Sequence, residues 1–321
     1  LDLLDPSILS ISADLRKMAL IIILLGGLTT IFCIKVLGCG TSMAVGLLSG
    51  ALTSTPAFSA AKDTLSSVYA GNPDAISAFE DIVTVGHGIA YLFGVVGVVL
   101  FVQVVPKMLK ADIDAERAKI SSVDTGKAAN KGKYFDIDGF GLAPFAIAVV
   151  IGIFVGGIKI PMGSSTFSLG TTGGCLLSSL VIAHFGHFGS LSMKPQKKML
   201  EIFREFGLMA FLIGAGIPGG ASFVQYFQAE YFLYGAIMTL IPMIVGFIIA
   251  KYVIKLPLFN NLGGITGGMT STPALGTLIN VAKTDDVASA YAAAYPIALI
   301  AVVLVSQFII VLFPDPLSLI G

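Results

Sequence analysis

Long apolar segments alternate along the chain with a few short polar stretches. A helix of about 20 apolar residues crosses the roughly 30 Å hydrocarbon core of a bilayer, whereas an outer-membrane barrel shows ten-residue alternation. The pattern therefore predicts an all-α integral membrane protein. The expected spans are 18–36, 84–105, 140–158, 168–186, 204–218, 231–250 and 286–312.

Two further segments, 40–61 and 258–282, are rich in Gly, Ser and Thr and carry a proline in the middle. Such a composition is typical of interrupted helices. Residues 46–58, GLLSGALTSTPAF, align without gaps on residues 263–275, GGITGGMTSTPAL, with seven of thirteen positions identical. The shared TSTPA indicates two related repeats.

The repeats divide the chain into a first transmembrane repeat, 1–106, a short polar linker, 107–138, and a second transmembrane repeat, 139–321. About 130 residues separate Gly139 from Thr270, whereas only 52 precede Thr53. We therefore expect the first repeat to lack the counterpart of two or three N-terminal spans.

Basic residues distinguish two topologies, because cytoplasmic loops carry an excess of Lys and Arg. If the TSTP segments cross fully and the linker is cytoplasmic, 14 basic residues lie inside and five outside. If each segment is a re-entrant hairpin, the count becomes 16 inside and three outside. We prefer the hairpin topology, which makes the repeats inverted. Arms of about eight residues, or 12 Å, would then bring the two tips together near the midplane.

Composition narrows the function classes. Charged residues make up 12% of the chain, hydrophobic residues 55%, and mean hydropathy is +0.92. Lys plus Arg and Asp plus Glu number 19 each, so we expect no basic face for nucleic acid. The three cysteines have no CxxC spacing, and we expect neither a metal nor a cofactor.

The two TSTP segments are the strongest candidates for a binding site. Thr55 and Thr272 are the expected N-caps, with the following prolines at the first helical position. A helix start with free N–H groups and a positive dipole end binds an anion without a basic side chain. The neighbouring hydroxyls could add contacts to a carboxylate or, with unwound carbonyls, to a small cation. The predicted substrate-binding residues are Thr53, Ser54, Thr55, Pro56, Thr270, Ser271, Thr272 and Pro273.

Glycines around these segments, Gly50, Gly267 and Gly268, predict close backbone packing or a hinge. The alternative is that Ser, Thr and Gly here only join helices, as small residues do in membranes. His87 lies within a span and is either a proton-coupling group or a hydrogen-bonded interior histidine. His184 and His187 are three residues apart, but no third metal ligand is evident.

These residues resemble the aspartate:alanine exchanger family. The resemblance rests on GALTSTPAF, GGMTSTPAL, FSLGTTGGCLLSSLVIAHFGHFG at 167–189 and REFGLMAFLIGAGIPGG at 204–220. It implies an inverted-repeat secondary carrier that exchanges acidic amino acids or related small carboxylates, as a homodimer of elevator type. Many members carry paired regulatory domains between the repeats, where this chain has about 32 residues.

We therefore expect a multi-pass protein of the cell membrane that transports small carboxylate anions, coupled to Na⁺ or H⁺, with membrane lipid as its surroundings and no nucleic-acid partner. The alternative is a channel in which the same tips form a selectivity constriction. We expect no enzymatic activity, because no GxSxG sequence and no intramembrane carboxylate that could orient a histidine are found.

Overall fold

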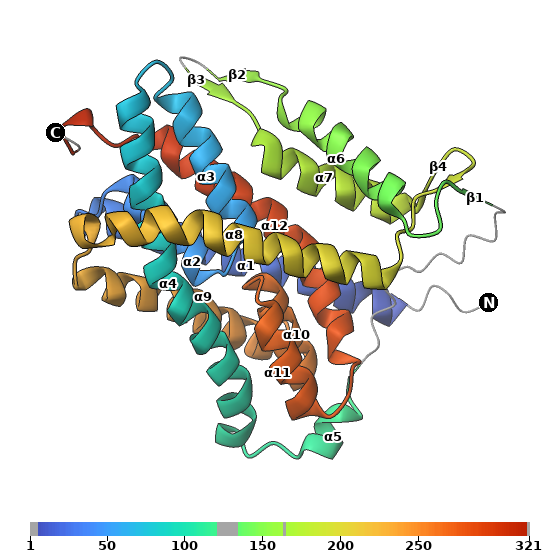
Figure 1. Cartoon of the computed structure of the whole chain (residues 1–321). Helices are drawn as coiled ribbons and strands as arrows, with labels where there is room; N and C mark the ends of the chain where they lie inside the picture. The colour runs from blue at the N-terminus through green and yellow to red at the C-terminus, as the bar shows by residue number, and fades with distance from the viewer. Residues whose placement is uncertain (1–5, 121–133, 163–164, 320–321) are drawn as a thin grey trace.

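The computed structural model describes residues 6–120, 134–162 and 165–319, and these are mostly helical (Figure 1). The expected helical fold is confirmed, and five short strands also occur among these residues, in the connections around two helices. Strands β2 (Ile160–Met162) and β3 (Ser165–Phe167) pair antiparallel. Strands β1 (Phe135–Asp136), β4 (His187–Phe188) and β5 (Leu191–Ser192) form a three-stranded sheet in the order β1-β5-β4. Pairing satisfies backbone groups that these loops would otherwise leave open.

Among the residues that the structure describes, four helices are long and apolar enough to cross a membrane. They match the expected spans 18–36, 84–105, 231–250 and 286–312. Their bounds are α1 (Pro6–Lys35), α4 (Pro73–Met108), α9 (Glu230–Tyr252) and α12 (Val287–Leu312).

The other three expected spans differ from the prediction. Helices α6 (Leu142–Gly156) and α7 (Gly170–Phe185) have 15 and 16 residues, which is about 23 Å of rise and less than the bilayer core. Helix α8 (Lys197–Tyr226) has 30 residues and extends well beyond 204–218 at both ends. Its start is charged, and it crosses in front of the other helices (Figure 1).

Each TSTP segment forms two helices joined by a short turn. The first pair is α2 (Thr41–Ala51) and α3 (Thr55–Val68), and the second is α10 (Leu258–Gly268) and α11 (Thr272–Ala282). Within its described residues, the polar linker contains the short helix α5 (Ile113–Arg117) and strand β1, and residues 121–133 lie outside the described part of the chain. A single 3₁₀ turn, η1 (Leu317–Leu319), follows α12.

The two outer ends of the first pair lie together. Asp315, just after α12, accepts a hydrogen bond of 2.6 Å from the backbone N–H of Thr41 at the start of α2. Its backbone carbonyl accepts one of 2.7 Å from the hydroxyl of Tyr69, just after α3. Helices α2 and α3 therefore enter and leave at the same end of the bundle.

The second pair opens toward the opposite end. Lys110, directly after α4, shares one cavity with Asn261 of α10 and another with Val281 of α11. Because α4 starts a few residues after α3 and ends beside α10 and α11, the two pairs enter the bundle from opposite ends. Their turns point toward each other.

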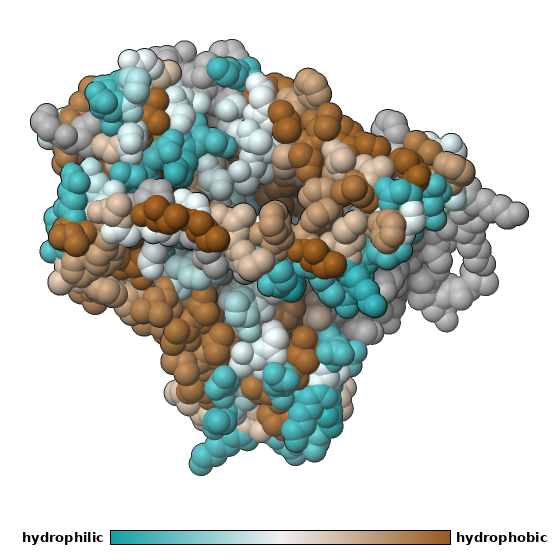
Figure 2. Space-filling view, in the orientation of Figure 1, coloured by the Kyte–Doolittle hydropathy of each residue, from teal (hydrophilic) through white to brown (hydrophobic). Residues whose placement is uncertain are grey.

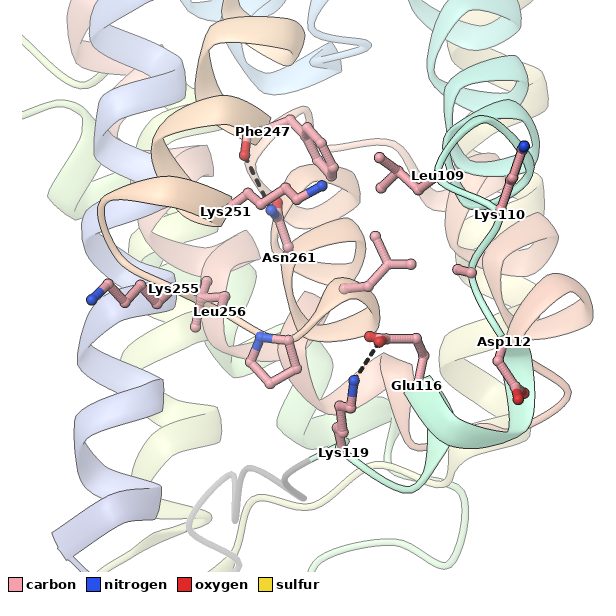
Figure 3. A pocket seen from close by; sticks show the side chains of 13 residues that line it. Leu109, Lys110, Asp112, Glu116, Lys119, Phe247, Lys251, Lys255, Leu256 and Asn261 are labelled. Carbon is pink, nitrogen blue, oxygen red and sulfur yellow. Dashed lines mark hydrogen bonds and ion pairs between the residues drawn. The ribbon is translucent and has the colours of Figure 1, made fainter.

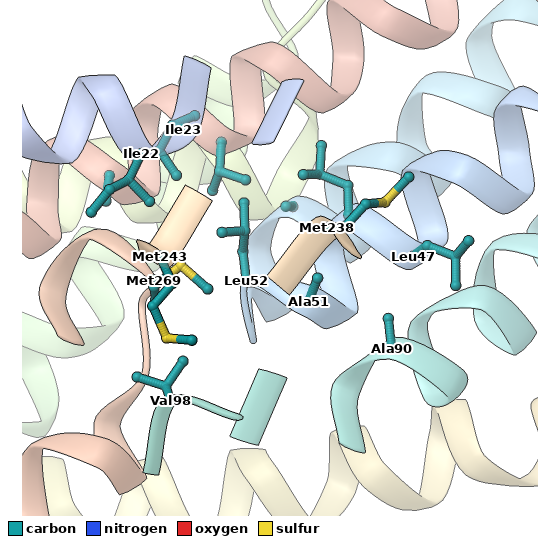
Figure 4. Packing of buried hydrophobic residues seen from close by; sticks show 14 of the residues in the cluster. Ile22, Ile23, Leu47, Ala51, Leu52, Ala90, Val98, Met238, Met243 and Met269 are labelled. Carbon is teal, nitrogen blue, oxygen red and sulfur yellow. The ribbon is translucent and has the colours of Figure 1, made fainter. Parts of the chain in front are cut away.

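Close packing of small and apolar residues joins these elements. Figure 4 shows Ala51 of α2 and Ala90 of α4 within a buried cluster that also includes Met238 of α9. A Cβ at Gly86 in α4 would lie 2.7 Å from the carbonyl oxygen of Met43 in α2. Lipid is as apolar as leucine, so such close backbone approach rather than hydrophobic burial joins helices in a membrane.

The outer face of α8 is apolar. Ile202, Phe206, Met209, Ile213 and Ile217 are 56–70% exposed and recur at helical spacing. Figure 2 shows hydrophobic surface over α6 and α7 beside the hydrophilic start of α8. An apolar stripe of this kind is suited to lipid or to another apolar surface.

Helix α6 has a polar cap outside its apolar length. The carboxylate of Asp138 accepts hydrogen bonds from the backbone N–H of Ala143 at 2.6 Å and of Phe140 at 2.8 Å, and from those of Gly141 and Leu142. These donors, led by Ala143, lower the pKa of Asp138 below its usual range. The ionised carboxylate therefore holds the start of α6 in place.

Candidate functional site

The turn between α2 and α3 closes in a Schellman motif. The N–H of Thr53 donates to the carbonyl of Gly50 at 2.9 Å, and the N–H of Ser54 donates to that of Ser49 at 2.8 Å. Thr53 has φ 51°, the left-handed position that glycine usually occupies at the end of a helix. A β-branched residue there is a conformational outlier.

The turn between α10 and α11 repeats the same geometry. The N–H of Thr270 donates to Gly267 at 3.1 Å, and that of Ser271 donates to Thr266 at 2.9 Å. Thr270 has φ 50°. Backbone strain of this kind costs about 1–3 kcal/mol per residue and concentrates at functional sites.

The two turns contact each other through reciprocal hydrogen bonds. The hydroxyl of Thr53 donates to the carbonyl of Met269 at 3.1 Å. The hydroxyl of Thr270 donates to the carbonyl of Leu52 at 2.5 Å. The strained threonines therefore hold one turn in fixed register against the other.

Serine, not threonine, occupies the N-cap position of the helix after each turn. Ser54 and Ser271 have extended backbones, with φ near −100° and ψ near 90°, and the helices begin at Thr55 and Thr272. The expectation that these threonines are the N-caps is wrong by one residue, and each proline is at the second helical position rather than the first. The error arises because both Ser and Thr are good caps, and sequence alone does not choose between adjacent ones.

The two caps are not equivalent. The Oγ of Ser54 accepts a hydrogen bond from the N–H of Ala57 at 3.3 Å. Ser271 makes no such cap, and its Oγ, on a fully buried residue, has no hydrogen-bond partner within the part of the chain that the structure describes. The start of α11 therefore keeps donor capacity that an added acceptor could use.

A cavity of about 460 Å³ lies against both turns. Six of the predicted substrate-binding residues line it: Thr53, Thr55, Pro56, Thr270, Thr272 and Pro273. The remaining lining comes from three helices, with Tyr91 from α4, Tyr295 and Leu299 from α12, and Arg204, Glu205, Gly207 and Phe211 from α8. The volume is within the range of small-molecule sites.

The other two predicted binding residues, Ser54 and Ser271, are fully buried and do not line this cavity. The three glycines pack behind the turns. An added Cβ would lie 2.8 Å from the Tyr91 nitrogen at Gly50, 2.7 Å from the Tyr291 carbonyl at Gly267 and 2.6 Å from Ile22 at Gly268. They permit close packing of the turns on α4, α12 and α1.

His87 lies beside the turns rather than in the cavity between them. Its Nδ1 is 2.9 Å from the Oγ of Ser49, which donates to the carbonyl of Gly46 at 2.8 Å. A hydroxyl has one proton, so in this arrangement Nδ1 donates to Ser49. His87 lines a separate cavity of about 250 Å³, which shares Tyr91 and Phe211 with the larger one.

The other two histidines lie away from the turns. The His184 ring contacts that of Phe185, and the His187 ring stacks on Tyr134 at 4.6 Å. No group of three or more potential metal ligands occurs among the residues described.

Sequence reasoning missed the charged pair in the cavity and the role of two tyrosines. Arg204 donates to Glu205 at 2.7 Å, from a helix that local sequence does not position. A weak sequence signal could have found Tyr91 and Tyr295. Residues 83–91 and 287–295 share Val, Ala and Tyr at their first, eighth and ninth positions.

A larger cavity, of about 610 Å³, lies at the outer end of α10 and contains none of the predicted binding residues. Figure 3 shows Lys119 paired with Glu116, while Lys110 and Lys255 are directed away from the cavity. Lys251 lies over the rings of Phe247 and Tyr252. Because this cavity contains none of the predicted binding residues, it is a weaker candidate than the cavity between the turns.

Comparison with known proteins identifies the family. The family model described as Asp-Al_Ex, Predicted Permease Membrane Region, matches residues 7–107 and 144–311. An uncharacterized transporter of Bacteroides fragilis is 33% identical over 204 residues, covering 62% of this chain and 38% of the relative. A putative transport protein of Dichelobacter nodosus is 34% identical over 181 residues, covering 53% of this chain and 32% of the relative.

The chain spans about a third of the length of these curated relatives. No solved structure matches it. The family match includes both TSTP turns and the whole of α8. The chain belongs to the Asp-Al exchanger family of membrane permeases.

Proposed function

We propose that this protein is a secondary active transporter that exchanges small carboxylate anions, most simply acidic amino acids or dicarboxylates. The observation that carries the proposal is the 460 Å³ cavity bounded by the starts of α3 and α11. Each helix start contributes about half a positive charge and free N–H donors. Two such starts facing one cavity form an anion site in an otherwise apolar protein.

The arrangement of helices supports alternating access between inverted repeats. The two helix pairs enter from opposite ends of the bundle, and broken helices whose turns meet at a central site are typical of secondary carriers. The reciprocal hydrogen bonds of Thr53 and Thr270 join the turns. The turns therefore move as one body, as an elevator-type mechanism requires.

The charge distribution supports a cytoplasmic linker. Lys107, Lys110 and Lys119 lie at the end of α4 and just after it, and Lys251 and Lys255 lie at the neighbouring end of α9. Cytoplasmic ends of membrane helices are enriched in such residues. We place the protein in the cell membrane as a homodimer, with the apolar stripe of α8 against lipid or the second copy.

Coupling to Na⁺ or H⁺ is part of the proposal. Carbonyls and hydroxyls at the turns are hard oxygen ligands suited to Na⁺, whereas His87 is the candidate for H⁺. Because His87 lies outside the substrate cavity and hydrogen-bonds Ser49, its substitution should change ion dependence more than substrate affinity.

The test is counterflow in proteoliposomes that contain the purified chain. Thr55→Val and Thr272→Val remove hydroxyls that line the cavity, and we expect them to reduce saturable uptake of labelled aspartate and succinate. The matched control is Thr277→Val, which lies in α11 outside the cavity and hydrogen-bonds the carbonyl of Pro273. Uptake unchanged in both test variants, or single-channel currents in place of counterflow, would overturn the proposal.

A further inference from the structure

The cavity between the turns contains one basic and one acidic residue among those the structure describes, Arg204 and Glu205. They are adjacent on α8 and form an ion pair of 2.7 Å. Both side chains are about 60% exposed, and exposed pairs of this kind hold each other weakly. Either partner can exchange for another charge at little cost.

The charges around the cavity match a doubly charged anion only if this pair opens. The starts of α3 and α11 supply about half a positive charge each, which together balance one carboxylate. Arg204 supplies a further whole charge and a planar guanidinium that binds a carboxylate through two parallel hydrogen bonds. While Glu205 is ion-paired with Arg204, the cavity is suited to a monoanion. When the Glu205 side chain turns to solvent, the cavity is suited to a dianion.

We infer that Arg204 binds the second carboxylate of a dicarboxylate substrate, and that Glu205 is the counter-ion it releases. This inference rests on the proposed function and assigns a separate task to each side of the cavity. The turns bind the first carboxylate of any substrate, and Arg204 discriminates dicarboxylates from monocarboxylates.

Arg204 and the anion-binding helix starts belong to different elements, and this makes the assignment of Arg204 testable. Arg204 comes from α8, whereas the anion-binding helix starts belong to the two TSTP segments. Removing the guanidinium leaves the contacts of Thr53 and Thr270 with the opposite turn intact. The two carboxylate subsites can therefore be disabled separately.

The experiment measures dissociation constants of the purified full chain for two probes of four carbons each, succinate and butyrate. Arg204→Gln should weaken succinate binding about 10- to 100-fold, the usual worth of a hydrogen bond to a charged group, and change butyrate binding less than twofold. Arg204→Lys should retain part of the succinate affinity. Glu205→Gln should tighten succinate binding.

The matched control is Glu201→Gln, one turn earlier on α8, whose carboxylate pairs with Lys197 and does not line the cavity. It should change neither constant. Equal weakening of both probes by Arg204→Gln, or no change in either, would overturn the inference. If Arg204→Gln does not fold, Arg204→Lys takes its place. The inference is then overturned if Arg204→Lys binds each of the two probes with the same affinity as the native chain.

If the proposed function is wrong, the binding data will differ from those expected when only the assignment of Arg204 is wrong. Thr55→Val combined with Thr272→Val should weaken both probes together. If the native chain binds neither probe, or if this double variant binds both normally, the anion site at the turns is wrong and the assignment of Arg204 falls with it.

Discussion

Substitution of Gly267 by alanine tests how tightly the second turn is packed against α12. An added Cβ would lie 2.7 Å from the Tyr291 carbonyl oxygen and 2.9 Å from the Ala294 Cβ, against 3.4 Å or more for an ordinary contact. The nearest neighbour is backbone, which cannot rotate away. Relief requires α10 to move by roughly 0.7 Å, and such overpacking costs about 1–3 kcal/mol.

Gly276 in α11 provides the matched control, since a Cβ there would have no neighbour within 4 Å. Alanine improves helix propensity by up to about 1 kcal/mol at either position. That gain cancels in the comparison, so Gly267→Ala should be less stable than Gly276→Ala by the overpacking cost of about 1–3 kcal/mol.

The assay is thermal unfolding of both variants in the same detergent. At about 2 °C per kcal/mol for a chain of this size, Gly267→Ala should melt roughly 2–6 °C below Gly276→Ala. Succinate should stabilise Gly276→Ala as it does the native chain, and Gly267→Ala less, because the start of α11 is displaced. Equal melting temperatures would show that α10 and α12 are not in the close contact described.

Three further measurements test other contacts. Thr53→Val or Thr270→Val leaves a buried carbonyl of the opposite turn unpaired and should cost about 1–3 kcal/mol, and a double-mutant cycle on melting temperature should show coupling between the two. Asp315→Ala removes the carboxylate that accepts hydrogen bonds from the first N–H groups of α2. If this lowers local stability by about 1–2 kcal/mol, maleimide labelling of Cys39, which is 5% exposed, should accelerate about 5- to 30-fold. An unchanged labelling rate would contradict this role of Asp315. Backbone N–H groups lower the pKa of Asp138, so the stabilisation of α6 by Asp138 is complete above the unfolded-state pKa and is lost as pH falls through the folded-state pKa. Hydrogen exchange at the start of α6 should therefore rise in acid, and Asp138→Asn should remove this rise.

Local sequence predicts the parts of the fold that depend on local interactions. The four long apolar helices follow from length and hydropathy, and the two turns follow from Gly, Ser, Thr and Pro. The caps were assigned one residue too late because Ser54 and Thr55 have similar capping propensities. The left-handed backbone of Thr53 decides between them, and its hydroxyl reaches the opposite turn, a contact that local sequence does not show.

Long-range contacts are the parts that sequence does not predict. Asp315 is 274 residues from Thr41, which it caps, and no local pattern connects them. Helix α8 was expected as a span of 204–218, but its charged start brings Arg204 to the turns. That placement depends on how α8 packs across the bundle rather than on its own periodicity.

Threonine at the left-handed position of both turns has a physical explanation in the tip contact. Glycine would adopt φ near 50° without strain, but it has no hydroxyl to reach the opposite turn. The two hydrogen bonds that fix the turns relative to each other therefore offset the backbone strain of Thr53 and Thr270. A site preorganised in this way does not have to be reassembled on each side of a membrane. In the proposed mechanism, the two turns move together as one body, and Arg204 of α8 binds the second carboxylate of the substrate.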